Sequence, residues 1–126
     1  MDASWLRAAG VVCGFLLVFF TGFWMARSGR PYGIGLVTLH KLVAVGILVV
    51  LGVSAYRADR ASALGALIWL VVSLALVVFV AMIASGGVLS AVESSPAATS
   101  LVHKVAPYLA APLTIAALYY VSQGTT

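Results

Sequence analysis

The sequence predicts an all-α integral membrane protein, an up-down four-helix transmembrane bundle built from two repeated helical hairpins. Composition is the first observation: 63% of the 126 residues are hydrophobic and only 8% are charged. A soluble domain carries about 25% charged residues, so this chain cannot cover a globule with polar side chains. The second observation is a set of four apolar runs long enough to cross a bilayer, and the third is an internal repeat.

The apolar runs predict four spans within a single membrane domain, residues 1–126. Each run holds about the 20 apolar residues that a bilayer core requires, and the runs cover residues 6–26, 35–56, 61–85 and 97–121. The first run lacks a small-x-small cleavage pattern, so we expect a retained helix and not a signal peptide. Asp59, in the tight second connection, is predicted to cap the third helix. Short connections make neighbouring helices antiparallel.

The net charge of +4 comes from seven Lys and Arg against three acids. These charges lie between the apolar runs and not on one basic face, so we expect membrane lipid and no nucleic acid as a partner. Basic residues occur on both sides of the predicted bundle, which leaves the membrane orientation open. The lone Cys13 permits neither an intrachain disulfide nor a thiolate cluster.

The internal repeat aligns the two halves of the chain. Each half contains a hydroxyl residue and a glycine, then 17 or 16 residues, then a His-Lys pair. The members are Thr21, Gly22, His40 and Lys41 in the first half, and Ser85, Gly86, His103 and Lys104 in the second. A duplicated two-helix unit places both histidines at equivalent positions on the second and fourth helices. Each is expected about six residues inside its helix, or roughly 9 Å along the axis.

His40 and His103 are the candidate metal ligands, because an ionisable residue inside a membrane is costly and by default indicates function. Zinc takes four donors, and the acids all lie at the ends of the spans or in loops. A porphyrin supplies four nitrogens itself, so two imidazoles suit one bis-His haem b. The alternative is that each histidine is hydrogen-bonded between helices or hydrated near the membrane surface.

Four basic residues are candidate partners for the haem propionates. Lys41 and Lys104 follow the histidines directly and can extend to the membrane surface. Arg27 and Arg30 belong to the adjoining connection. Plain anchoring at the membrane surface is the alternative for the lysines.

Gly22 and Gly86 are the remaining candidate site residues. They are expected at the level of the histidines on the first and third helices, where a missing side chain leaves space for a macrocycle. The alternative is that each marks a helix C-terminus, where glycine is common.

These features resemble the small bacterial b-type membrane cytochromes, four-helix inner-membrane proteins of the broad cytochrome b-561 class. The resemblance rests on the Thr-Gly and Ser-Gly pairs, the two His-Lys pairs and the four-span layout, and it covers nearly the whole chain. It implies that His40 and His103 are axial haem ligands and that the protein lies in the bacterial cytoplasmic membrane. Members of that class commonly carry four ligand histidines for two haems, whereas this chain has two. At most one bis-His haem therefore fits.

A single haem near one end of a helix roughly 33 Å long leaves over 20 Å to the opposite membrane face. We therefore expect electron exchange with quinone or a partner protein near one face. No catalytic residue is assigned, and enzymatic activity and homo- or hetero-oligomerisation stay open. The main alternative is a non-catalytic accessory or pigment-binding subunit of a larger membrane complex. Small multidrug transporters are a poorer match, because their proton coupling uses a glutamate in the first helix.

Overall fold

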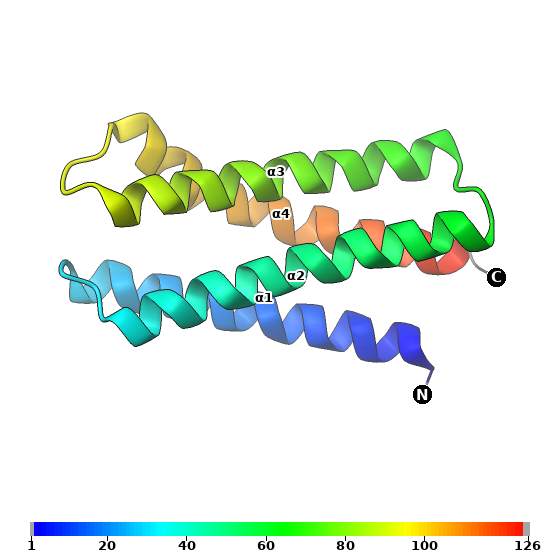
Figure 1. Cartoon of the computed structure of the whole chain (residues 1–126), viewed down its shortest axis with the longest axis horizontal. Helices are drawn as coiled ribbons and strands as arrows, with labels where there is room; N and C mark the ends of the chain where they lie inside the picture. The colour runs from blue at the N-terminus through cyan, green and yellow to red at the C-terminus, as the bar shows by residue number, and fades with distance from the viewer. Residues whose placement is uncertain (1, 125–126) are drawn as a thin grey trace. The chain divides into compact units, whose positions relative to one another are not determined.

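Four helices make up the protein in a computed structural model that describes residues 2–124. Each is long and apolar enough to cross a membrane, so the predicted all-α fold of four membrane helices is confirmed, and the chain is a multi-pass membrane protein. The helices, coloured along the chain in Figure 1, are α1 (Ala3–Ser28), α2 (Ile34–Ala61), α3 (Ala66–Ala91) and α4 (Ala97–Gly124). α1 and α3 each have 26 residues, and α2 and α4 each have 28. The equal lengths agree with a duplicated hairpin.

The third helix continues beyond the end that the sequence predicts. The sequence predicts an end at Ser85, but α3 runs through Gly86 and Gly87, and the Val92 N–H still donates to the Val88 carbonyl at 3.1 Å. Glycine costs about 1 kcal/mol inside a helix in water. In a bilayer, however, no water hydrogen-bonds a released backbone group, so the helix is retained.

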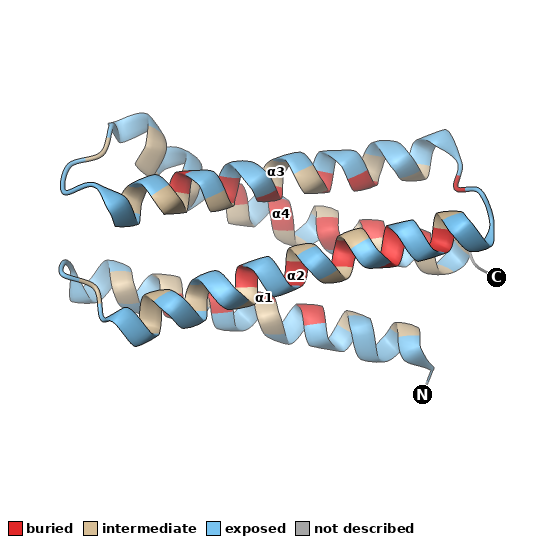
Figure 2. Cartoon of the chain, in the orientation of Figure 1, coloured by how far each residue is buried: buried red, intermediate tan, exposed pale blue. Residues whose placement is uncertain are grey.

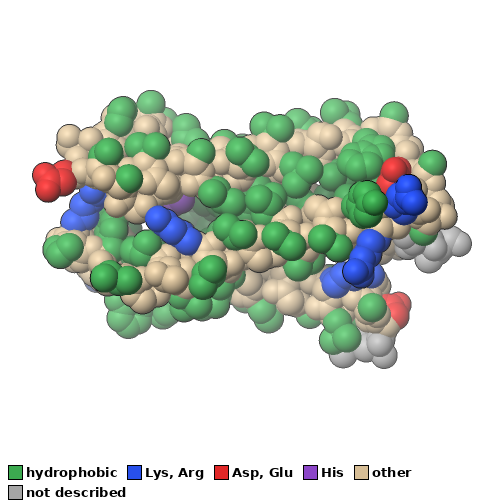
Figure 3. Space-filling view, viewed as in Figure 1, with side chains coloured by type: hydrophobic (Ala, Val, Ile, Leu, Met, Phe, Trp, Pro, Cys, Tyr) green, Lys and Arg blue, Asp and Glu red, His purple; other side chains and the backbone are tan. Residues whose placement is uncertain are grey.

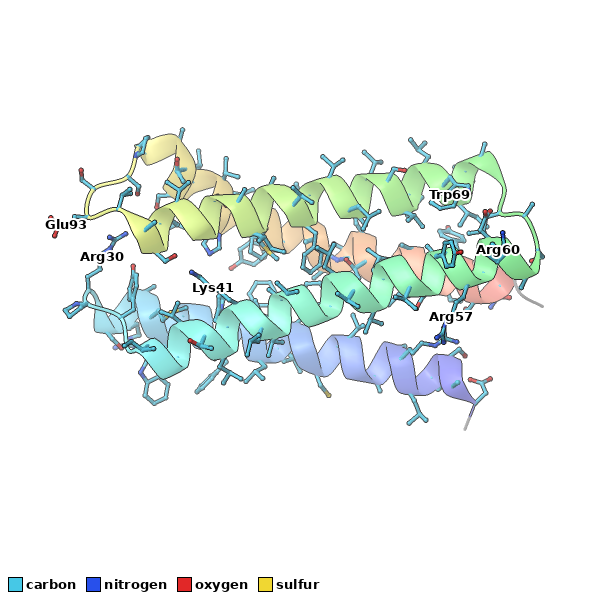
Figure 4. The ribbon with its side chains drawn as sticks, viewed as in Figure 1. Arg30, Lys41, Arg57, Arg60, Trp69 and Glu93 are labelled. Carbon is cyan, nitrogen blue, oxygen red and sulfur yellow. The ribbon has the colours of Figure 1, made fainter. Side chains whose placement is uncertain are left out.

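The connection between α2 and α3 differs from the predicted one. Asp59 does not cap α3, because α2 continues to Ala61 and the N-cap of α3 is Gly65. The Asp59 carboxylate instead accepts hydrogen bonds from the Leu64 N–H at 3.0 Å and from Trp69 Nε1 at 3.2 Å. Figure 4 places Trp69 at this end of α3. Asp59 therefore ties the connecting loop and the first turn of α3 to the end of α2.

We expect Asp59→Ala to lower the free energy of unfolding by about 1 kcal/mol, because two donors lose their shared acceptor. The measurement is unfolding in a mixed-detergent titration followed by circular dichroism. Asp59→Asn keeps one side-chain carbonyl oxygen and is expected to retain most of that stability. Equal losses in the two variants would contradict this role.

The first compact unit, Met1–Val50, contains α1 and the first part of α2. The two helices approach closely, since a Cβ added at Gly14 would lie 3.1 Å from Ile47 Cγ1. The residues that the unit buries are Val11, Phe15, Val18 and Thr21 of α1, with Ala44 and Ile47 of α2.

The second compact unit, Leu51–Thr126, contains the second part of α2 with α3 and α4. Its core is rich in alanine, which lets membrane helices approach closely. The buried residues of this core, seen among those drawn red in Figure 2, are Leu51, Ala55, Ala58, Leu64, Val72, Ala75, Ala117 and Val121. α4 contains Pro107 and Pro112 and stays helical through both.

Large apolar side chains cover the outward faces of the helices. Examples are Leu16 of α1, Leu42 of α2, Val77 of α3 and Leu109 of α4. Figure 3 shows apolar side chains over the middle of one face, with Lys and Arg side chains toward the helix ends. This distribution suits contact with membrane lipid, which needs no polar covering.

Candidate functional site

The two histidines occupy the same position in their helices. His40 lies six residues after Ile34, where α2 begins, and His103 lies six residues after Ala97, where α4 begins. Both positions agree with the depth expected from the sequence, about 9 Å from the helix start. Each imidazole is partly buried and contacts the preceding helix of its own hairpin.

In the first hairpin, His40 is bound to a threonine hydroxyl of α1. Thr21 Oγ1 lies 2.8 Å from His40 Nδ1. The same oxygen lies 2.8 Å from the carbonyl of Leu17 and 3.2 Å from the carbonyl of Val18, one turn earlier in α1. Thr21 is 2% exposed, whereas His40 is only partly buried.

In the second hairpin, His103 is bound to a serine hydroxyl and to a backbone carbonyl of α3. His103 Nδ1 lies 3.0 Å from the Met82 carbonyl oxygen and 3.3 Å from Ser85 Oγ. Ser85 Oγ also donates to the Met82 carbonyl at 3.0 Å. Both halves of the repeat thus bring a hydroxyl of the first helix to the Nδ1 atom of a histidine on the second.

These partners allow the same protonation pattern in both rings, and for His103 they require it. A neutral imidazole has one N–H and one nitrogen with a lone pair. The Met82 carbonyl can only accept, so Nδ1 of His103 carries the proton. Thr21 Oγ1 also lies within hydrogen-bond distance of two carbonyls of its own helix, and when its single proton goes to one of them, Oγ1 accepts from Nδ1 of His40. With these donors the lone pair of each ring is on Nε2, the arrangement usual in histidines that bind metals through Nε2.

Both candidate glycines face the histidine rings within their hairpins. A Cβ added at Gly22 would lie 3.2 Å from His40 Cε1, and one added at Gly86 would lie 2.7 Å from His103 Cε1. The alternative that these glycines mark helix C-termini is wrong, because α1 continues to Ser28 and α3 to Ala91. In each hairpin the glycine leaves space that the imidazole ring occupies. A role in making room for a macrocycle stays a prediction.

The four basic candidates lie on the exposed surface near the connections. Lys41 and Lys104 are exposed and follow the histidines directly. The Arg27 guanidinium lies over the Phe23 ring, 5.8 Å from its centroid, and Arg30 lies over the Tyr32 ring at 5.4 Å. Figure 4 shows Arg30 in the α1–α2 connection and Lys41 further along α2.

The structure therefore assembles one imidazole site in each hairpin. The sequence identifies both histidines and both glycines, but it singles out Thr21 and Ser85 only as markers of the repeat. Their similar spacing from the histidines, 19 and 18 residues, is the signal that they are hydrogen-bond partners. The pairing of His40 with His103 on one ligand stays a prediction.

Comparison of the chain with known protein families, curated proteins and solved structures finds no match. The function is therefore inferred from the residues of this chain. Within residues 2–124 no three or more His, Cys, Asp or Glu side chains come together as a metal-binding group. Each hairpin contains one histidine.

Proposed function

We propose that this chain is a membrane-bound b-type cytochrome that holds one haem with His40 and His103 as axial ligands and transfers electrons. The observation that carries the proposal is the repeated imidazole site. In each hairpin the Nδ1 atom has an oxygen partner that can accept from it, and an Nδ1–H ring has its lone pair on Nε2, where an iron ligand needs it. By its likeness to the small b-type membrane cytochromes, the protein is assigned to the bacterial cytoplasmic membrane.

The donor set suits a porphyrin better than a bare metal ion. Zinc requires four protein or water donors, whereas a haem brings four nitrogens and leaves two axial positions. The chain contains two histidines, which is the number that one haem requires. When bound, haem supplies reversible one-electron chemistry whose potential depends on its axial ligands and surroundings.

Basic residues near the histidines support the proposal. A haem carries two propionates, which favour cations close to the membrane surface. Lys41 and Lys104 are each adjacent to a ligand, and both are exposed. Arg27 and Arg30 add positive charge at the connection that leads into α2. We assign these four side chains to propionate binding.

The position of the histidines favours electron exchange on one side of the membrane. Each lies about 9 Å from the start of a helix that is about 42 Å long, so a haem held there is far from the other end. A quinone dissolved in the membrane, or a protein docked on the nearer face, is the proposed electron partner.

The visible spectrum of the purified protein tests this function. We expect a sharp reduced α-band on addition of dithionite, and we expect His40→Ala and His103→Ala each to abolish it. Leu39→Ala is a matched control for the first variant, because Leu39 is 43% exposed and adjoins His40 in α2. Val105→Ala, at a position 48% exposed in α4, serves the same purpose for His103.

A colourless wild-type protein expressed with ample haem would overturn the proposal. In that case the histidines act only as hydrogen-bonding groups within each hairpin, as an accessory subunit of a larger complex would use them. Far-red absorption would indicate a chlorophyll-type pigment on the same imidazoles. Circular dichroism of each variant establishes that loss of the band is not loss of helix.

A further inference from the structure

We propose that Thr21 and Ser85 are positioning residues that hold His40 and His103 in the Nδ1–H tautomer and so present Nε2 as the ligand nitrogen. The tautomer itself is a property of the protein without any ligand. The consequence for iron binding rests on the proposed function. The two parts are tested by separate measurements.

Thr21 has a single hydroxyl proton and several possible acceptors for it. Two carbonyl oxygens of α1 lie 2.8 and 3.2 Å from Thr21 Oγ1, and each can only accept. Donation to one of them leaves Oγ1 a lone pair toward His40 Nδ1, 2.8 Å away. In this arrangement the imidazole donates from Nδ1. Thr21 therefore sets both the ring orientation and the tautomer.

Ser85 acts together with a backbone group. Its hydroxyl donates to the Met82 carbonyl at 3.0 Å, and that carbonyl also lies 3.0 Å from His103 Nδ1. Ser85 Oγ is 3.3 Å from the same Nδ1 atom. Removal of the serine hydroxyl leaves the carbonyl in place as an acceptor. We therefore expect a smaller effect from Ser85→Ala than from Thr21→Val.

Thr114 provides a matched control for Thr21. It is fully buried in α4, and its Oγ1 has no hydrogen-bond partner among residues 2–124. Thr→Val replaces a hydroxyl by a methyl of similar size at both positions. At position 114 the change removes an unsatisfied polar atom, which is neutral or stabilising, whereas at position 21 it removes the partner of a histidine.

The first experiment measures the tautomer in protein purified without haem. Protein labelled with ¹⁵N in its histidine rings is studied by NMR in detergent micelles at a pH where the rings are neutral. The chain has two histidines, so the spectra of His40→Ala and His103→Ala assign the two rings. We expect Nδ1–H signals from both rings in the wild type and a mixture of tautomers for His40 in Thr21→Val. Thr21→Ser, which keeps the hydroxyl, and Thr114→Val should match the wild type.

An Nε2–H signal from His40 in the wild type would overturn the proposal, as would an unchanged His40 signal in Thr21→Val. The second experiment is a haemin titration of the same variants. We expect Thr21→Val to weaken haemin binding about 10- to 100-fold, the usual cost of removing a group that orients a metal ligand. Equal haemin affinities of the wild type and Thr21→Val would overturn the ligand part. Absence of haemin binding by the wild type would overturn the proposed function, and the NMR spectra would still decide the tautomer.

Discussion

Gly86→Ala is expected to abolish haem binding, although it adds a single methyl group. The added Cβ would lie 2.7 Å from His103 Cε1 and 3.1 Å from His103 Nδ1. Carbon atoms do not approach so closely, so something must shift, and we expect the imidazole to move and its hydrogen bond to the Met82 carbonyl to be disrupted. We expect loss of the reduced α-band. In the haem-free protein, the NMR signal of His103 should shift while that of His40 stays unchanged.

Two other glycine variants serve as comparisons for the expected effect of Gly86→Ala. Gly22→Ala should weaken haem binding only in part, because its Cβ would lie 3.2 Å from His40 Cε1 and a small shift relieves the contact. Gly87→Ala meets no atom within 4 Å and should keep the α-band, with a gain of up to about 1 kcal/mol in helix stability. A Gly86→Ala protein with a normal α-band and an unchanged His103 signal would contradict the proposed geometry.

Leu51→Ala is expected to cause a large loss of stability, with a fall of roughly 2 kcal/mol in the free energy of unfolding. Leu51 is fully buried and belongs to the core of the second unit, which is otherwise mostly alanine and valine. Lipid tails are as apolar as leucine, so in a membrane the hydrophobic transfer term is nearly absent. The cost arises from the van der Waals contacts that the cavity removes. A mixed-detergent unfolding titration followed by circular dichroism measures it.

Leu70→Ala is the matched control for this prediction. Leu70 lies on α3 in the same unit and is 56% exposed, so lipid can occupy the space that its side chain leaves. We expect a loss well below 1 kcal/mol. Similar losses in the two leucine variants would show that Leu51 does not pack against protein in the membrane.

The internal repeat predicts part of the candidate site from the sequence alone. Spacing alone predicts that His40 and His103 lie at equivalent helical positions, and both lie six residues from the helix start. The same spacing marks Gly22 and Gly86, which the structure places against the imidazole rings. The spacing does not distinguish a glycine that ends a helix from a glycine inside one. The backbone hydrogen bonds that extend α3 to Ala91 are retained because the surroundings contain no water, and the spacing carries no information on that.

The connection at Asp59 was predicted incorrectly for a related reason. An acid before an apolar run is typical of a helix N-cap, but α2 extends through Asp59, and its carboxylate binds Leu64 and Trp69 beyond the turn. Which donors a carboxylate reaches depends on how the chain returns after the turn. Local sequence carries no such information.

By itself, the sequence determines four membrane helices and the positions of the two histidines, because apolar length and helical periodicity are local properties of the chain. Only the tertiary structure decided what each imidazole contacts. His103 is bound by the carbonyl of Met82, a group that every residue carries, so no pattern of side chains could have identified it. Thr21 and Thr114 are the same residue type at buried positions, yet one binds a histidine and the other has no partner within residues 2–124. The difference depends on which helix face meets the neighbouring helix, and packing sets that choice.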